Sequence, residues 1–124
     1  MTELLNMVGA IATMMMGAMG LFAPRMAAGF VGLQAETPAG RSEFRATYGG
    51  LFVAMGVVPL LTMHPLAFAT AALCWIGAAM GRAVSIVLDG AATPKNFGAV
   101  AFECAFALLL VIGAPWSALW RAWA

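Results

Sequence analysis

Charged residues are scarce in this 124-residue sequence: Asp, Glu, Lys and Arg make up 9% of it, whereas 64% of its residues are hydrophobic. Typical soluble domains are about 25% charged. The mean hydropathy is +0.96. A small water-soluble domain cannot hide so much apolar surface, because it leaves a large share of its chain exposed. We therefore expect one domain, spanning residues 1–124, whose solvent is lipid.

The residues on which most enzymes depend are also few. His64 is the only histidine, and there is no Cys–His, Ser–His or glycine-rich phosphate motif. Cys74 and Cys104 lie in apolar runs, where we interpret them as small hydrophobic residues rather than as a disulfide. The Lys and Arg residues form no basic patch, so no nucleic acid is expected as a partner. We predict no metal and no cofactor, and membrane lipid is the ligand compatible with this composition.

Four apolar runs are long enough, at about 20 residues each, to cross the hydrocarbon core as helices. They lie at about residues 4–23, 46–63, 65–88 and 97–119. Pro24 ends the first run, Pro65 begins the third and Pro94 precedes the fourth. The first run follows Glu3, where a signal peptide would carry Lys or Arg, so we interpret it as a true span. The predicted fold class is all-α, an integral membrane bundle of four transmembrane helices.

The connection between residues 24 and 41 has two interpretations. Met26, Phe30 and Leu33 fall at i, i+4 and i+7, which is the spacing of one helix face. This spacing favours a short helix in the membrane interface. An ordinary ordered loop fits the same residues.

The cationic residues predict an orientation. Both termini and the turn between the second and third spans share one side, where Arg121 is the only Lys or Arg. The other side has four: Arg25, Arg41, Arg45 and Lys95. The positive-inside rule therefore predicts that both termini lie outside the cytoplasm. An interfacial aromatic belt is expected at the outer end of the fourth span, made of Trp116, Trp120 and Trp123.

Glycines in the spans predict close helix contacts. Helices associate in lipid through small residues, because apolar burial alone does not favour helix–helix over helix–lipid contact. The first three spans carry candidate packing positions at Gly9, Gly17, Gly49, Gly50, Gly56, Gly77 and Gly81. These positions serve either the bundle of the protomer itself or a partner helix.

Two ionisable residues lie at depth in the spans. Arg82 and Glu103 are each about six residues from the same end of their helices, which places both roughly 9 Å below one membrane boundary. A lone charge in hydrocarbon costs about 2.5–3.5 kcal/mol or more. We therefore predict that they pair, and the alternative is that Arg82 extends to the headgroups.

Other polar residues gather in the same layer. Ser85 and Asp89 follow Arg82 at i+3 and i+7, and Arg45 shares a helix stripe with Tyr48. The predicted intramembrane polar cluster comprises Glu43, Arg45, Tyr48, Arg82, Ser85, Asp89 and Glu103. In this interpretation, the stretch "RSEFRATYGG" is one wall of the cluster.

Three fragments carry a family resemblance: "EFRATYGGLFVAMG", "GRAVSIVLDG" and "AFECAFALLL". Together they resemble a bacterial four-helix membrane family known as domain of unknown function 4345. The likeness runs from the second span to the middle of the fourth, at Arg45, Tyr48, Gly49, Gly50, Gly81, Arg82, Ser85, Asp89, Gly90 and Glu103. The resemblance implies a compact four-helix bundle in a bacterial inner membrane, and it implies no activity.

Three functions remain open at this stage. The first is a structural or accessory subunit that packs against a larger membrane complex, with lipids and either a membrane-protein partner or a second copy as its neighbours. The alternative is a small proton- or cation-linked transporter, acting as a homo-oligomer through Glu103. A third is a lipid or catalytic site in which Arg45 and Arg82 hold an anionic headgroup. The absence of a recognisable catalytic set makes an enzyme the less expected of these.

Overall fold

The computed structural model describes residues 2–113 and residue 117. The expected aromatic belt, Arg121 and the end of the fourth span lie outside the described residues. Within them the chain is helical and has no strand. The elements are α1 (Thr2–Phe22), α2 (Pro24–Val31), α3 (Pro38–Phe44), η1 (Arg45–Gly50), α4 (Leu51–Thr62), α5 (Pro65–Leu88) and α6 (Pro94–Val111).

Four stretches of the described chain are helical, long and apolar enough to cross a membrane. They are Glu3–Phe22, Pro38–Thr62, Pro65–Leu88 and Pro94–Val111. The predicted all-α class with four candidate transmembrane helices is therefore confirmed. The second helix begins at residue 38 rather than at 46, because Thr37 caps it: the Thr37 Oγ1 accepts a hydrogen bond from the Gly40 N–H at 3.0 Å. The charged residues of "RSEFR" thus lie within this helix.

The second helix changes from α-helical to π-helical hydrogen bonding for one turn and then returns to α-helix. Residues Arg45–Gly50 form η1, a π-helical turn, and the Leu51 N–H donates to the carbonyl of Ala46, five residues earlier. A π turn holds about one more residue than an α turn and often marks a functional position. It therefore rotates the residues before it relative to those after it.

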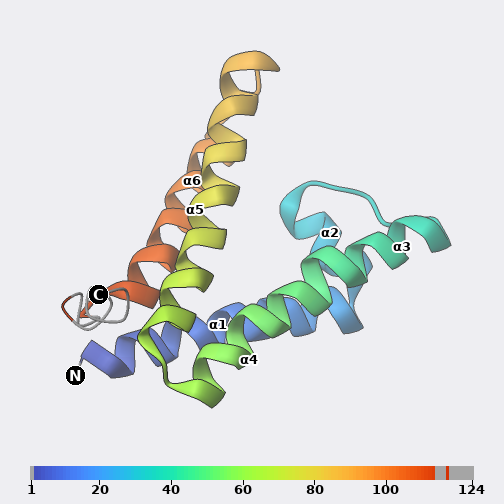
Figure 1. Ribbon diagram of the computed structural model, residues 1–124. Coiled ribbons are helices and arrows are strands. Elements are labelled where there is room, and N and C mark those ends of the chain that lie inside the picture. The colour runs from blue at the N-terminus through green and yellow to red at the C-terminus, as the bar shows by residue number, and fades with distance from the viewer. Residues whose placement is uncertain (1, 114–116, 118–124) are drawn as a thin grey trace.

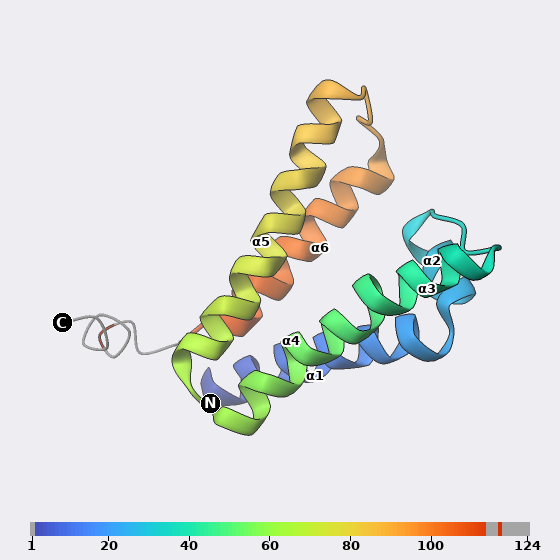
Figure 2. The same ribbon diagram turned by 45° about the vertical axis from the view of Figure 1, so that its right-hand side comes forward.

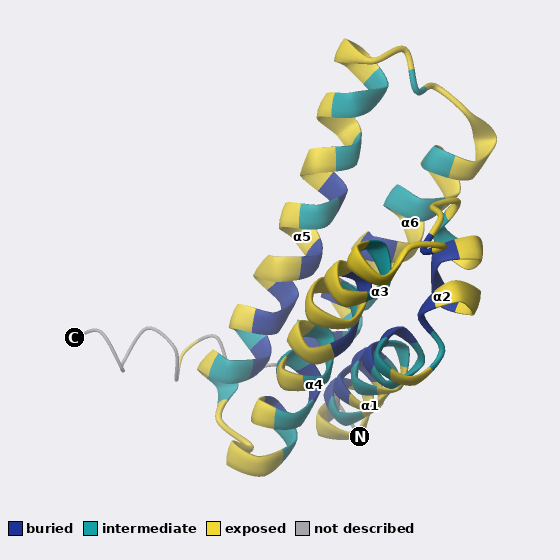
Figure 3. Cartoon of the chain, turned by 90° about the vertical axis from the view of Figure 1, so that its right-hand side faces the viewer, coloured by how far each residue is buried: buried dark blue, intermediate teal, exposed yellow. Residues whose placement is uncertain are grey.

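The helices form two hairpins that meet near the N-terminus and diverge from there (Figures 1 and 2). One hairpin pairs α1 with the continuous helix α3–η1–α4, and the other pairs α5 with α6. The bundle is therefore less compact than the family resemblance implies. In Figure 3, α5 carries its buried residues on the side that faces the other helices and is exposed on its outer side.

A buried hydrogen bond joins the hairpins where they meet. Thr13 is fully buried, and its Oγ1 donates to the Gly9 carbonyl at 2.8 Å and accepts from Trp75 Nε1 at 3.0 Å. Apolar residues from α1, α5 and α6 surround this bond, among them Ala10, Phe68, Ala71, Ala72, Ala107 and Leu110. The bond satisfies the indole N–H inside an apolar core, where an unpaired donor would be costly.

Asn6 ties the start of α1 to the end of α6. Its side chain is 7% exposed. With the amide oriented to donate, its nitrogen lies 2.8 Å from the Ile112 carbonyl oxygen and 3.0 Å from that of Leu109. Carbonyls in the last turn of a helix lack amide partners, so Asn6 fills that need at the end of α6.

Glycines on α1, η1 and α4 let two backbones touch. A Cβ on Gly17 would lie 2.4 Å from the Val53 nitrogen, and one on Gly56 would lie 2.5 Å from the Ala10 carbonyl oxygen. Gly49 packs against Leu21, where a Cβ would lie 2.9 Å from the Leu21 nitrogen. Gly20, which the sequence analysis did not single out, packs against the Tyr48 carbonyl. These contacts bring α1 and the second helix together along their lengths.

The other predicted packing glycines behave differently. Gly9 lies against Leu109 and Leu110 at ordinary to tight distances, whereas a Cβ on Gly50 would meet only the Arg45 carbonyl oxygen, at 3.8 Å. Nothing lies within 4 Å of a Cβ built on Gly77 or on Gly81. The packing of the protomer therefore accounts for the glycines of α1 and α4 but not for those of α5.

The connection after α1 contains a helix rather than a plain loop. In α2, Ala27 and Ala28 are buried, while Met26 and Phe30 are 63% and 65% exposed. Gly32 ends the helix in the left-handed conformation, with φ at 80°. The helix interpretation of this connection is correct, and its exposed apolar face is the kind that lies in a membrane interface.

Gly17→Ala and Gly77→Ala form a matched pair of mid-helix substitutions. Gly17→Ala is expected to lower the free energy of unfolding by about 1–3 kcal/mol, because the new Cβ would overlap the backbone of the second helix. Gly77→Ala should leave stability unchanged or raise it by up to about 1 kcal/mol, since the new Cβ meets nothing and alanine favours a helix. Thermal unfolding in detergent, followed by circular dichroism, measures both. Equal effects would contradict the packing of α1 against α4.

Candidate functional site

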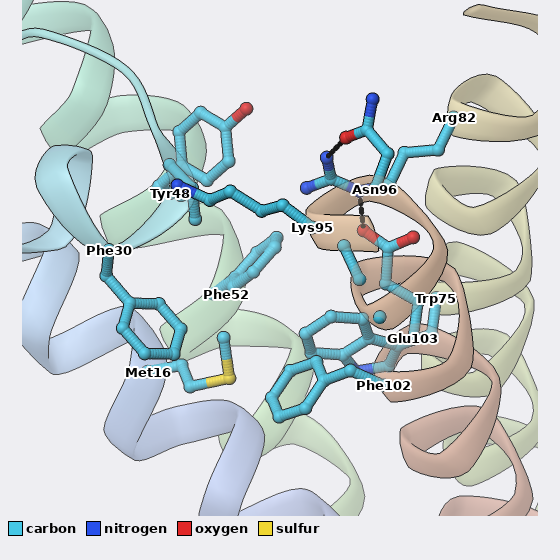
Figure 4. A pocket seen from close by; sticks show the side chains of 13 residues that line it. Met16, Phe30, Tyr48, Phe52, Trp75, Arg82, Lys95, Asn96, Phe102 and Glu103 are labelled. Atoms are coloured by element: carbon cyan, nitrogen blue, oxygen red, sulfur yellow. Dashed lines mark hydrogen bonds and ion pairs between the residues drawn. The ribbon is translucent and has the colours of Figure 1, made fainter. Parts of the chain in front are cut away.

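An ion pair joins α5 to α6. The Arg82 Nε donates to the Glu103 Oε1 at 2.6 Å, and the side chains of Arg82 and Glu103 are 29% and 7% exposed. The Arg82 Nη1 also donates to the Asn96 Oδ1 at 3.4 Å (Figure 4). The predicted pairing of these two charges is therefore confirmed.

The turn between α5 and α6 sets this register. Thr93 begins α6 by accepting a hydrogen bond from the Asn96 N–H at 3.2 Å. The Asn96 side chain in turn donates from Nδ2 to the Ala91 carbonyl at 2.9 Å. Gly90 adopts a left-handed φ of 66°, which reverses the chain at little cost. The short turn brings Asn96 beside the ion pair.

One atom of the ion pair has no protein partner. The Glu103 Oε2 is buried and lacks a hydrogen bond, although its side chain lines a cavity. Leaving a buried acceptor unsatisfied costs about 1–3 kcal/mol, and more when it is charged. Because this oxygen is buried, a donor from the cavity reaches it only if neighbouring side chains move.

A cavity of about 270 Å³ lies between the two hairpins, and we call it the cleft. Both hairpins line it, with the residues Met16, Phe30, Val31, Tyr48, Phe52, Trp75, Arg82, Lys95, Asn96, Gly98, Ala99, Phe102 and Glu103. Arg82, Asn96 and Glu103 lie together in its lining, whereas the Lys95 ammonium lies on the opposite side, near Tyr48 (Figure 4). Aromatic rings occupy much of the space between, so the cleft is mainly apolar with its one ion pair at a polar end.

A second hollow of about 360 Å³ shares part of this lining. It has Tyr48, Phe52, Arg82 and Glu103 in common with the cleft, and it adds Gly81 and Ser85. The ion pair thus faces two neighbouring spaces.

Lys95 crosses the mouth of the cleft. Its side chain extends from the first turn of α6 toward the α1 hairpin (Figure 4). Its Nζ lies so near Gly32 that a Cβ there would be 2.7 Å from it. Lys95 is exposed, and no described residue accepts a hydrogen bond from it. An anion at the mouth would find this ammonium unengaged.

Aromatic rings connect the two hairpins behind the polar end. Tyr48 stacks on Phe44 with ring centroids 4.3 Å apart, and Phe52 meets Trp75 at 5.2 Å. The Trp75 ring continues the series to Phe106 at 4.7 Å. Such contacts each add about 0.5–1.5 kcal/mol beyond area burial. They give the cleft a wall of fixed shape.

The structure brings together only part of the predicted polar cluster. Tyr48, Arg82, Ser85 and Glu103 line the shared spaces. Asp89 stays at the turn, where it accepts a hydrogen bond from the Ser85 hydroxyl at 2.6 Å.

Glu43 and Arg45 lie elsewhere. The Glu43 Oε1 accepts from the Thr47 hydroxyl at 2.8 Å, and the Arg45 Nε donates to the Leu21 carbonyl at 2.9 Å. The π turn explains the separation, because its extra residue rotates Arg45 away from the stripe that holds Phe52. The expectation that Arg45 forms a wall of the cluster therefore needs correction.

The sequence analysis did not identify the apolar lining. Phe30, Trp75 and Phe102 face the cleft, and Lys95 lies at its mouth, although the sequence suggested only a topological role for this lysine. One signal was available: Trp75 precedes Arg82 by seven residues and so lies on the same face of α5. The other lining residues depend on the angle between the two hairpins, which no local sequence pattern encodes.

A double-mutant cycle tests the ion pair. Arg82→Leu should lower the free energy of unfolding by an amount near the lower end of roughly 3–5 kcal/mol, because it strands a buried carboxylate while Arg82 itself is partly exposed. The double variant Arg82→Leu/Glu103→Leu should recover most of that loss. Denaturation in mixed detergents measures both. Additive losses from the two single variants would show that the charges do not interact.

Comparison with known proteins adds a family. No curated protein matches the chain, and no solved structure does. A family model described as "Domain of unknown function (DUF4345)" matches residues 1–114, so the match includes the first span as well as the three fragments. The described ion pair, cleft and four candidate membrane helices all lie within this range. The chain therefore belongs to the DUF4345 family.

Proposed function

We propose that this protein binds an amphipathic molecule in the cleft, with the polar end of the ligand at the Arg82–Glu103 pair and its apolar part along the aromatic wall. One observation carries the proposal. The charged Arg82–Glu103 pair lies in the lining of a mainly apolar cavity between helices that are suited to a membrane. Ligand sites combine these features, an apolar lining and a few convergent polar groups.

The charges of the lining favour an anionic headgroup. Arg82 and Lys95 contribute two positive charges and Glu103 one negative charge, so the lining carries a net charge of +1 (2 − 1). The Arg82 guanidinium is already engaged at Nε and Nη1, which leaves Lys95 and the Arg82 Nη2 for an anion. The buried Glu103 Oε2, which lacks a donor, would accept a hydrogen bond from a headgroup hydroxyl after a movement of the lining side chains. A singly anionic lipid with hydroxyl groups meets both requirements.

The orientation of the protein bears on where this ligand comes from. We propose that the protein lies in a bacterial inner membrane with the open end of the cleft toward the cytoplasm. The four Lys and Arg residues at that end support this orientation. A C-terminal reporter that is active only in the periplasm tests it, and an inactive reporter would reverse the orientation.

An accessory role in a larger membrane complex is the second candidate. Its specific support is that Gly77 and Gly81 of α5 are exposed and have no neighbour within 4 Å of a built Cβ. Small residues on an open face allow a partner helix to approach closely in lipid. Solubilisation in a mild detergent followed by mass measurement tests this role, and recovery of the free protomer alone would exclude it.

Proton-coupled transport through Glu103 has less support. Its Oε1 accepts a hydrogen bond from Arg82 at 2.6 Å, so a carboxyl without its charge would leave the Arg82 guanidinium without a counter-charge. A transport cycle would also need the carboxyl to be accessible from both sides in turn. We therefore favour binding over proton transport for this residue.

Lipid titration followed by native mass spectrometry tests the cleft. Phosphatidylglycerol should bind more tightly than phosphatidylcholine with the same acyl chains, because only the former has a net negative charge and hydroxyl donors. Lys95→Gln should raise the Kd for phosphatidylglycerol at least about fivefold, since one cation near an anionic headgroup contributes about 1 kcal/mol. Glu3→Gln, on the other end of α1, is the control and should change nothing. Equal affinity for the two lipids would refute the proposal.

A further inference from the structure

Three arginines surround a shallow depression outside the cleft. Arg25 of α2, Arg41 of α3 and Arg45 of η1 line it, and its volume is about 480 Å³. The rest of its lining is Phe22, Ala23, Pro24 and Met26, none of which lines the cleft. Half of the six Lys and Arg residues of the chain thus converge at one corner, where α1 ends.

Backbone carbonyls hold two of these guanidinium groups. The Arg45 Nε donates to the Leu21 carbonyl at 2.9 Å, in the last turn of α1, where carbonyls lack their helical amide partners. The Arg41 Nη1 donates to the Glu36 carbonyl at 2.6 Å. Because Arg45 is held through Nε, the edge formed by its two terminal nitrogens is left for a bidentate contact. The fold therefore orients these cations without neutralising them.

The corner has too few acids to balance its charge. The Glu36 Oε2 lies 3.9 Å from the Arg25 Nε, and both side chains are well exposed, at 72% and 64%. Exposed pairs of this kind are weak and are screened by salt. The nearby Glu43 hydrogen-bonds to Thr47 and does not line the depression. Three guanidinium groups and one carboxylate leave a local charge of +2 (3 − 1).

We propose that this corner binds the phosphate of an anionic membrane lipid, as a site separate from the cleft. Phosphate oxygens match the planar fork of arginine, which lysine does not offer. A lipid is favoured over a soluble anion because the apolar rim is exposed: Phe22 is 79% exposed and Met26 is 63% exposed. These side chains stand where α1 ends, so acyl chains can contact them while the phosphate meets the arginines. The local charge of +2 favours a phosphate monoester, which carries more than one negative charge.

Arg25→Gln is the sharpest test, because Arg25 makes no hydrogen bond that the fold requires. Titration with dioleoylphosphatidic acid, followed by native mass spectrometry, should show a Kd at least about fivefold higher than that of the unmodified protein. Arg25→Lys should recover part of the loss, since it restores the charge but not the fork. Raising the salt concentration should weaken binding to the unmodified protein.

Three controls make the outcomes decisive. Lys95→Gln, in the cleft, should leave the affinity for phosphatidic acid unchanged. Arg25→Gln should leave the affinity for phosphatidylglycerol unchanged. The proposal for the corner and the proposal for the cleft can therefore be refuted separately. Inorganic phosphate at equal concentration should not displace the lipid. Displacement by inorganic phosphate would assign the corner to a soluble anion and overturn the lipid proposal. Equal binding of phosphatidylcholine, or no effect of Arg25→Gln, would overturn the site itself.

Discussion

The structure depends on the pairing of Arg82 with Glu103, because a largely buried carboxylate without its counter-charge would be costly. The pair requires that α5 and α6 run antiparallel through a short turn, with both residues at the same level. Thr93 and Asn96 supply that turn, and Asn96 also contacts the guanidinium. The pair also forms the polar end of the cleft. Of the ion pairs in the described part of the chain, it is the one whose side chains are largely buried. Fold and candidate site therefore follow from one electrostatic constraint.

Side-chain size explains why a cleft lies beside this pair. On α1 and the second helix, glycines such as Gly17 and Gly56 allow backbone contact, so that hairpin closes tightly. Between the hairpins the contacts are made by large rings, above all Phe52 against Trp75. Small residues draw helices together in lipid, and large residues hold them apart. The two hairpins thus meet at the Thr13–Trp75 hydrogen bond and leave space beyond it.

Sequence patterns were sufficient to predict features that are local, and features that depend only on how far a residue lies from the end of its helix. The four candidate spans follow from hydropathy, and the Arg82–Glu103 pair follows from counting residues along two helices joined by a short turn. Patterns failed where geometry departs from a regular α-helix. The π turn rotates Arg45 away from the cleft, and the spacing of the side chains in the sequence does not predict that turn. The sequence also could not show that Gly77 and Gly81 lack a packing neighbour. A glycine pattern marks where a helix can approach closely, but only the structure shows whether a helix does so.

The central claim is that an amphiphile occupies the cleft, and the position of its acyl chain tests that claim most directly. A phosphatidylglycerol analogue with a photoreactive group on the chain can be crosslinked to the protein in bilayers and the adducts mapped by mass spectrometry. Occupancy of the cleft predicts adducts on the lining aromatics Phe52, Trp75 and Phe102. Adducts confined to outward-facing residues such as Leu73 and Val87, which are 69% and 79% exposed, would contradict it.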